Sequence, residues 1–361
     1  MTLSSLLNKV ASRPASYHKK ANYEFGDAMG AGAFGVVRRA RNIKTNEDVA
    51  IKVILRSRVK GKEDEIMSEL ELLKQLHHPH IVTLKDYFES RDKIYIVTQL
   101  CTGGELFDRI CEQGSFTEKA AAKMFREIAD AVQYLHHSNI VHRDIKPENL
   151  LFESKDPESE LVLCDFGIAR PLHEPDELIT SSAGSLGYAA PEIFSSYGHG
   201  KPCDVWSLGV VLFTILSGYS PFQAETPQDF MSEVHPGFTV KFHTRYWKDV
   251  SDDAKDLIRQ MLQFRPEKRP TIDEVLQHKW VTGASSELNL LPGIKPGLSS
   301  RARWRLAFER VRLAKRIRDL GLEDSDDERP KPMLKFHEVV LAAQRNKDLL
   351  TEESKEQSTD A

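Results

Sequence analysis

Cysteine is scarce in this sequence, and its spacing excludes a disulfide or zinc framework. Four cysteines occur among 361 residues. None is paired in a C-x-x-C pattern or set near histidines at the spacing of a zinc site. In a chain of this length we expect all four to be reduced thiols of an intracellular protein. They are Cys101, Cys111, Cys164 and Cys203.

Long apolar runs and targeting signals are also absent. The longest apolar run, Val205 to Leu216, is shorter than the about 20 residues that cross a membrane, and it predicts a buried helix. The N-terminus has no basic-then-apolar signal pattern, Thr2 stands where myristoylation requires glycine, and no prenylation cysteine lies near the C-terminus. We therefore expect no membrane span and a cytoplasmic location, with the nucleus as an additional location left open.

The sequence has no large excess of charge of either sign. It holds 50 Lys and Arg against 54 Asp and Glu, a net charge of −4, so no global basic field predicts nucleic-acid binding. No EF-hand loop is present, so any response to calcium has to pass through a partner. The length exceeds one average domain and falls short of three.

Two short motifs indicate the reaction class. Residues 142–149 read His-Arg-Asp-Ile-Lys-Pro-Glu-Asn, and residues 165–167 read Asp-Phe-Gly. Phosphoryl transfer from ATP requires one carboxylate that accepts the proton of the attacking hydroxyl, and a second carboxylate and an amide that hold Mg²⁺ on the phosphates. Asp144 fits the first role, and Asp165 and Asn149 fit the second. Lys146 would neutralise charge on the transferred phosphoryl group. We therefore predict ATP and Mg²⁺ as cofactors.

A glycine-rich stretch and a lysine precede these motifs in the order that nucleotide binding requires. Gly30, Gly32 and Gly35 fit the pattern G-x-G-x-x-G-x-V, in which the backbone closes over a triphosphate. Lys52 ends an apolar strand, and Glu69 lies in a predicted helix over residues 63–75. Taken singly, each has an ordinary alternative: a β-turn, a solvated lysine and an exposed helix carboxylate. Their order and spacing favour one ATP site in which Lys52 pairs with Glu69.

In this order, the motifs resemble those of the eukaryotic protein kinases over residues 23–281. Further matches are the Ala-Pro-Glu at 190–192, the Asp at 204 and the Arg at 269. The resemblance implies an α+β fold with two lobes, a small antiparallel N-lobe with one helix and a larger helical C-lobe. It places Thr98 at the gatekeeper position, gives Asp204 the task of bracing the catalytic loop, and pairs Glu192 with Arg269. The ATP-binding residues that it implies are Met29, Gly30, Gly32, Gly35, Val37, Ala50, Lys52, Glu69, Gln99, Cys101, Glu105, Leu151 and Asp165.

The same resemblance implies specificity and a control point. Lys146, two residues after Asp144, favours a Ser/Thr kinase over a Tyr kinase, and Ser185 stands where such kinases usually carry threonine. The glutamate matching Glu105 lies near the ATP ribose and receives a substrate arginine, so we expect substrates with Arg three residues before the target Ser/Thr. Kinases with an arginine at the position of Arg143 tend to hold a loop phosphate with it. An upstream kinase would add that phosphate at one of three candidates, Thr180, Ser181 and Ser182.

A basic segment follows the kinase-like region. Residues 301–320 predict a helix with two apolar faces, one with Trp304 and Phe308 and the other with Ile317, and arginines on the flanks. Two faces suit a partner that wraps around the helix, as acidic Ca²⁺-loaded calmodulin does. The sequence around Trp304 resembles the anchor region of calcium/calmodulin-dependent protein kinase type I, with fungal members as the nearer resemblance. Pro292 and Pro296 precede this segment, so residues 283–300 are not expected to form one continuous helix.

We therefore predict a Ser/Thr kinase whose C-terminal regulatory helix inhibits it until Ca²⁺–calmodulin binds. The predicted divisions are a flexible lead (1–22), the kinase domain (23–281), an autoinhibitory and calmodulin-binding segment (282–320) with Trp304, Phe308 and Ile317 as anchors, and an acidic, polar tail (321–361). Two alternatives stay open. One is a calcium-independent basophilic kinase whose basic tail binds acidic lipid. The other is a non-catalytic scaffold that binds nucleotide and calmodulin.

Overall fold

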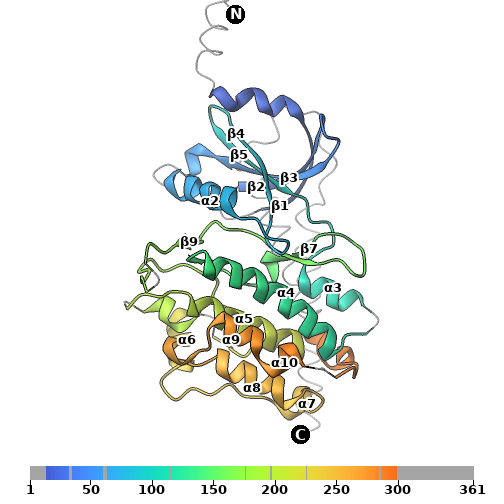
Figure 1. Cartoon of the computed structure of the whole chain (residues 1–361), viewed down its shortest axis with the longest axis vertical. Coiled ribbons are helices and arrows are strands. Elements are labelled where there is room, and N and C mark those ends of the chain that lie inside the picture. The colour runs from blue at the N-terminus through green and yellow to red at the C-terminus, as the bar shows by residue number, and fades with distance from the viewer. Residues whose placement is uncertain are drawn as a thin grey trace, which may run out of the picture.

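A computed structural model describes residues 14–31, 35–59, 63–113, 115–174, 176–195, 197–224, 226–283 and 286–298. These residues form two lobes, a smaller one dominated by a sheet and a larger one dominated by helices (Figure 1). The two-lobed α+β fold expected from the sequence is confirmed. None of the described helices has the length and apolar character that a membrane crossing requires.

Among the described residues, the N-lobe is a five-stranded antiparallel sheet in the order β1-β2-β3-β5-β4 with one α-helix. The helix, α2, covers Glu63–Gln75, the range that the sequence predicts. Two short 3₁₀ helices, η1 (Ala15–Asn22) and η2 (Arg56–Arg58), complete the lobe. The strands are β1 (Tyr23–Ala31), β2 (Gly35–Asn42), β3 (Asp48–Leu55), β4 (Leu84–Glu89) and β5 (Lys93–Gln99).

Strand β3 shows how the sheet positions the site. Successive side chains of a strand point to opposite faces. Val49, Ile51 and Val53 are buried in a cluster with Phe88, Tyr95 and Val97 on one face of the sheet. Ala50 and Lys52, which alternate with them, consequently face the space between the lobes.

The C-lobe is built around α5 (Pro202–Ser217), whose residues are buried from Cys203 to Ser217. The prediction of a buried helix over Val205 to Leu216 is therefore confirmed. Gly218, with φ +80°, ends this helix. The other helices are α3 (Leu106–Glu112), α4 (Glu118–His137), α6 (Pro227–Glu233), α7 (Thr244–Trp247), α8 (Asp252–Met261), α9 (Ile272–Gln277) and α10 (Lys279–Thr282). The short elements are β6 (Ile140–Val141), η3 (Pro147–Asn149), β7 (Leu150–Phe152), β8 (Leu161–Leu163), β9 (Arg170–Pro171), η4 (Pro191–Phe194) and η5 (Pro266–Lys268).

The end of the predicted lead packs on the N-lobe. Helix η1 lies against β4, where the Lys19 ammonium is 2.6 Å from Asp86 Oδ1 and the Tyr23 hydroxyl donates to Asp86 Oδ2 at 3.1 Å. The Ser16 hydroxyl accepts the backbone N–H of Glu89 at 3.0 Å. Whereas the composition of residues 1–22 predicts a flexible lead, residues 15–22 thus have specific partners.

The chain beyond α10 packs on the C-lobe. The Asn289 side chain accepts the backbone N–H of Phe116 at 3.0 Å, and Leu290 N–H donates to the Phe116 carbonyl at 2.7 Å. Residues 291–298 are helical and bury Leu291, Ile294 and Leu298. As predicted, residues 286–290 interrupt any longer helix, but Pro292 and Pro296 are both accommodated in the helix that follows. Pro292 lies in its first turn, where no backbone N–H is required.

Candidate active site

Asp204 holds the backbone of the catalytic loop in an unusual conformation. Its buried carboxylate accepts the N–H groups of His142 at 2.9 Å and Arg143 at 2.8 Å, and the His136 ring lies at 2.9 Å. Arg143 has φ +69°, a left-handed conformation that is uncommon outside glycine. The bracing role that the resemblance implied for Asp204 thus has a direct geometric counterpart. Glu192 and Arg269 also pair as expected, at 2.6 and 2.8 Å.

Asp144 lies at the centre of a compact hydrogen-bonded group. Its Oδ2 accepts the Lys146 ammonium at 2.6 Å, and its Oδ1 accepts the Ser185 hydroxyl at 2.7 Å. Lys146 also donates to Ser185 at 2.8 Å. Asn149 donates its amide N–H to the Asp144 carbonyl at 2.8 Å. This bond uses the amide nitrogen and does not involve the Asn149 side-chain oxygen. These contacts fix the Asp144 carboxylate in one orientation, which a group that aims a hydroxyl requires.

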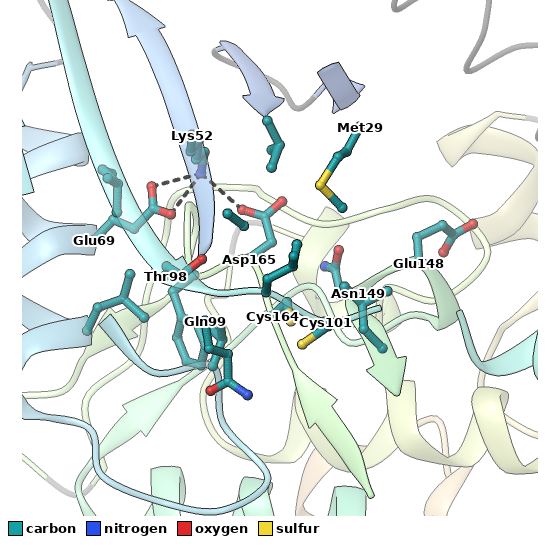
Figure 2. A pocket seen from close by; sticks show the side chains of 18 residues that line it. Met29, Lys52, Glu69, Thr98, Gln99, Cys101, Glu148, Asn149, Cys164 and Asp165 are labelled. Carbon is teal, nitrogen blue, oxygen red and sulfur yellow. Dashed lines mark hydrogen bonds and ion pairs between the residues drawn. The ribbon is translucent and has the colours of Figure 1, made fainter. Parts of the chain in front are cut away.

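A second charged group spans the lobes. Lys52 Nζ lies 2.8 Å from Glu69 Oε1 and 3.3 Å from Asp165 Oδ1 (Figure 2). Burial would lower the pKa of Lys52, but the carboxylates of Glu69 and Asp165 outweigh it and raise that pKa. The Lys52 charge in turn lowers the pKa of Asp165 despite its burial. The predicted Lys52–Glu69 pair is therefore formed.

A cavity of about 230 Å³ opens between the lobes beside these groups (Figure 2). It brings together side chains from β1, β2, β3, β5, α2 and the loop around Asp165. The predicted site residues that line it are Met29, Val37, Ala50, Lys52, Glu69, Gln99, Cys101, Asn149, Leu151 and Asp165. The gatekeeper Thr98 lines it as well. The cavity thus unites residues that lie more than a hundred positions apart in the sequence.

Four of the predicted ATP-binding residues are not among the described residues that line this cavity. Gly30 and Gly35 lie in β1 and β2 but do not line the cavity, and Gly32 falls outside the described residues. A Cβ on Gly35 would come within 3.0 Å of the Val53 carbonyl, so strand packing also requires this glycine. Glu105 is the N-cap residue of α3, and its backbone bridges to Leu151.

Sequence reasoning missed several lining residues. Glu148 and Cys164 are the most informative, because each is the neighbour of a residue that the motifs identify. Glu148 precedes Asn149, and Cys164 precedes Asp165. Their positions in or directly beside the motifs were the only available signal, since neither residue type indicates an adenine pocket. The other missed residues are Leu73, Val82, Ile96 and Phe166.

The three candidate phosphorylation sites have different surroundings. The Arg143 guanidinium donates to the Ser181 hydroxyl at 3.2 Å and to the Ser181 carbonyl at 3.1 Å. Ser182 instead donates its hydroxyl to the Ile193 carbonyl at 3.0 Å, and Thr180 is exposed. Of the three, Ser181 is therefore the hydroxyl that lies against the arginine.

The side chains available as metal ligands are consistent with a cation that is bound jointly by the protein and by phosphates. No group of three or more His, Cys, Asp or Glu that could bind a metal occurs among the described residues. Asp165 and Asn149 offer two oxygen ligands beside the cavity. Mg²⁺ is commonly bound by one or two protein oxygens, substrate phosphates and water. The residues present thus fit Mg²⁺ bound with ATP, and not a site built from protein ligands alone.

Comparison with known proteins extends these observations. Residues 23–281 match the protein kinase domain model. Calcium/calmodulin-dependent protein kinase cmkA of Emericella nidulans is 52% identical over 91% of this chain and 78% of its own length. A calcium/calmodulin-dependent protein kinase of Metarhizium anisopliae is 51% identical over 90% of this chain and 85% of its own. The type 1B enzyme of Mus musculus is 36% identical over 87% and 92%.

Proposed function

Since this chain belongs to the protein kinase family, as one of its calcium/calmodulin-dependent members, we propose a division of labour among its residues. Asp144 is the base that accepts the proton of the substrate Ser or Thr hydroxyl and aims its oxygen at the γ-phosphate. Lys146 neutralises charge as the phosphoryl group moves. The observation that carries this proposal is the orientation of Asp144 by Lys146 and Ser185 at 2.6 and 2.7 Å.

The cavity between the lobes is the nucleotide site of this proposal. Its apolar residues Met29, Val37, Ala50 and Leu151 would enclose adenine, and Lys52, held by Glu69, would contact the α- and β-phosphates. Asn149 and Asp165 would hold Mg²⁺, which supplies positive charge against the phosphates when bound. Glu148, which also lines the cavity, adds a further carboxylate to this site.

A Ser/Thr peptide phosphorylation assay tests this assignment. We expect ATP- and Mg²⁺-dependent transfer to a peptide with Arg three residues before Ser, and much slower transfer when that Arg is replaced by Ala. Glu105 is the proposed receptor for that arginine, because a carboxylate binds guanidinium in a bidentate manner. Nucleotide binding without phosphate transfer would instead favour the scaffold alternative.

We further propose that Ca²⁺–calmodulin relieves inhibition by the C-terminal segment. Two arguments support this: the names of the relatives, and the basic segment with its candidate anchors Trp304, Phe308 and Ile317, which lie outside the described residues. Residues 286–298 hold the start of that segment on the C-lobe. Activity with calcium and calmodulin, compared with activity in chelator, tests the proposal. Equal activities together with salt-sensitive binding to acidic vesicles would favour the lipid-binding alternative.

A phosphate on Ser181 is the proposed second requirement for full activity. Arg143 already contacts the Ser181 hydroxyl, and a phosphate there would add charge-assisted hydrogen bonds to the same guanidinium. Since Arg143 adjoins Asp144, the loop phosphate and the catalytic base would be coupled through one residue. Ser181→Ala should lower stimulated activity, whereas Ser182→Ala should not.

A further inference from the structure

Ser16 matches the substrate preference that we propose for this kinase. Of all the serines and threonines in the sequence, it alone has an arginine three residues before it, Arg13. The three candidate activation-loop sites have Glu177, Leu178 and Ile179 at that position instead. The preference for Arg three residues before the target therefore selects one residue of the kinase itself, and that residue lies outside the activation loop.

The N-lobe holds the Ser16 side chain in place. Ser16 is partly buried, and its hydroxyl accepts the backbone N–H of Glu89 at 3.0 Å. Further along η1, the Lys19 ammonium pairs with Asp86 at 2.6 Å and donates to the Tyr87 carbonyl at 3.2 Å. These bonds keep η1 against β4, so the Ser16 hydroxyl becomes available to an active site only when η1 detaches from the N-lobe.

The docked Ser16 lies far from the catalytic loop of its own chain. Helix η1 packs on the end of the N-lobe that is farther from the C-lobe (Figure 1). Asp144, the proposed base, lies in the C-lobe between β6 and η3. Short elements near a chain end open locally at a small free-energy cost, so a detached η1 is accessible to a second copy of the kinase.

We propose that Ser16 is an autophosphorylation site, which one copy of the kinase phosphorylates in another, and that docking of η1 limits the rate. The proposal rests on the substrate preference and on the role of Asp144 proposed above. The Ser16 oxygen forms a bond to the γ-phosphorus of ATP while the bond from that phosphorus to the β,γ-bridging oxygen breaks. The hydroxyl proton passes to Asp144 of the acting copy, and ADP leaves with the electron pair. Glu105 of the acting copy binds the Arg13 guanidinium.

The test uses two full-length variants with ATP, Mg²⁺, calcium and calmodulin. The Ser16→Ala chain is the enzyme, because it cannot carry the phosphate itself, and the Asp144→Asn chain is the substrate, because it should not phosphorylate itself. Peptide mapping by mass spectrometry reports the rate at each serine and threonine of the substrate chain. We expect faster phosphorylation at Ser16 than at Ser12, which has Lys9 three residues before it. Adding Arg13→Ala to the substrate chain should slow phosphorylation at Ser16 roughly tenfold or more, because a hydrogen bond to a charged group is lost.

A change at Asp86 in the substrate chain tests the restraint by docking. Asp86→Ala removes the partner of Lys19 but leaves the sequence around Ser16 unchanged. We expect phosphorylation at Ser16 to become roughly two- to fivefold faster, the range for loss of a partly exposed ion pair. Asp253→Ala is the matched control, because it breaks another surface pair, with Lys279, in the C-lobe. Equal rates in the two variants would show that docking of η1 does not limit the reaction.

An unrelated peptide with Arg three residues before Ser separates failure of this inference from failure of the proposed function. If the Ser16→Ala chain phosphorylates that peptide but not Ser16 of the substrate chain, while the wild-type chain does not label its own Ser16, the autophosphorylation site is wrong. If only the wild-type chain carries the phosphate, transfer between copies is wrong. If Arg13→Ala has no effect, recognition through this arginine is wrong. If the peptide reacts equally with Ala in place of its Arg, the proposed substrate preference itself fails.

Discussion

At the scale of single residues, a change at Asp144 should affect the rate of phosphate transfer and ATP affinity to different extents. The Asp144 carboxylate accepts Lys146 and Ser185 but does not line the cavity. Asp144→Asn should therefore lower phosphate transfer by about 10²–10⁴-fold, the usual contribution of a positioned base, while ATP affinity changes little. Steady-state transfer to a Ser peptide and calorimetric ATP binding measure the two effects. Near-normal turnover in this variant would show that Asp144 is not the base.

Ser185 allows a finer test of how that base is held. Ser185→Ala removes the donor to Asp144 Oδ1 at 2.7 Å and should reduce turnover with little change in the KM for ATP. Ser185→Thr keeps the hydroxyl and is the matched control, since threonine is the usual residue of related kinases here. If the alanine and threonine variants lose activity equally, the hydroxyl has no positioning role.

Lys52 and Glu69 form a pair whose loss should affect stability as well as activity. Glu69 is 4% exposed, so Lys52→Met leaves a carboxylate buried without its cation. Breaking a buried pair by removing one partner typically lowers the free energy of unfolding by about 3–5 kcal/mol. Because the Lys52–Glu69 pair keeps some contact with solvent, we expect a loss at the lower end of this range. The double variant Lys52→Met/Glu69→Met should recover much of the unfolding free energy in a denaturant titration, but no phosphate transfer. Recovery of activity would contradict the assigned role of Lys52.

At the scale of elements, local patterns predict much of the structure, and tertiary contacts explain the rest. Helix α2 has the predicted limits, because its apolar positions repeat with helical period and its ends lack competing signals. The composition of residues 15–22 does not reveal a docked helix, since its partners Asp86 and Glu89 lie far along the chain. The two prolines at 292 and 296 likewise signal a break, yet burial of Ile294 and Leu298 stabilises a helix around them.

The contact between Gly218 and Gly297 offers a prediction about the helix at 291–298. A Cβ at Gly297 would come within 3.0 Å of the Gly218 carbonyl, which is rigid backbone at the end of α5. Gly297→Ala should therefore displace this helix from the C-lobe and increase hydrogen exchange over 286–298. Gly293→Ala is the control within the same helix, because its Cβ would meet nothing within 4 Å. Equal exchange in the two variants would contradict the close packing.

At the scale of the whole molecule, the sequence predicts which residues form the site better than how the lobes enclose it. Motifs identify Lys52, Asp144 and Asp165 because phosphoryl transfer restricts those positions to a few residue types. Cys164, Glu148 and the aliphatic lining are set by the approach of the two lobes, which no local pattern encodes. The same holds for residues 286–290, whose attachment depends on Phe116 and Lys119 in the C-lobe.

The packing of residues 286–298 on the C-lobe determines which truncation removes the regulatory segment without lowering the stability of the kinase domain. Leu298 is fully buried and Ile294 nearly so, whereas the candidate calmodulin anchors begin at Trp304. A chain ending at 298 should keep the unfolding temperature of the full chain and be active without calcium. A chain ending at 290 loses three buried aliphatic side chains, each of which contributes about 1.5–3 kcal/mol when fully buried, and should unfold at a lower temperature.

The excised segment supplies the complementary measurement. A peptide of residues 299–322 should bind calmodulin in calcium but not in chelator, with a blue shift of Trp304 fluorescence as the indole enters an apolar pocket. Trp304→Ala should weaken binding by about 2 kcal/mol or more, since an anchor aromatic carries much of such an interface. Reversing charge at Arg312, Lys315 and Arg316 should mainly slow association. The chain ending at 298 could be active without calcium while the peptide fails to bind calmodulin. In that case the segment inhibits the kinase, but calcium does not act through this helix.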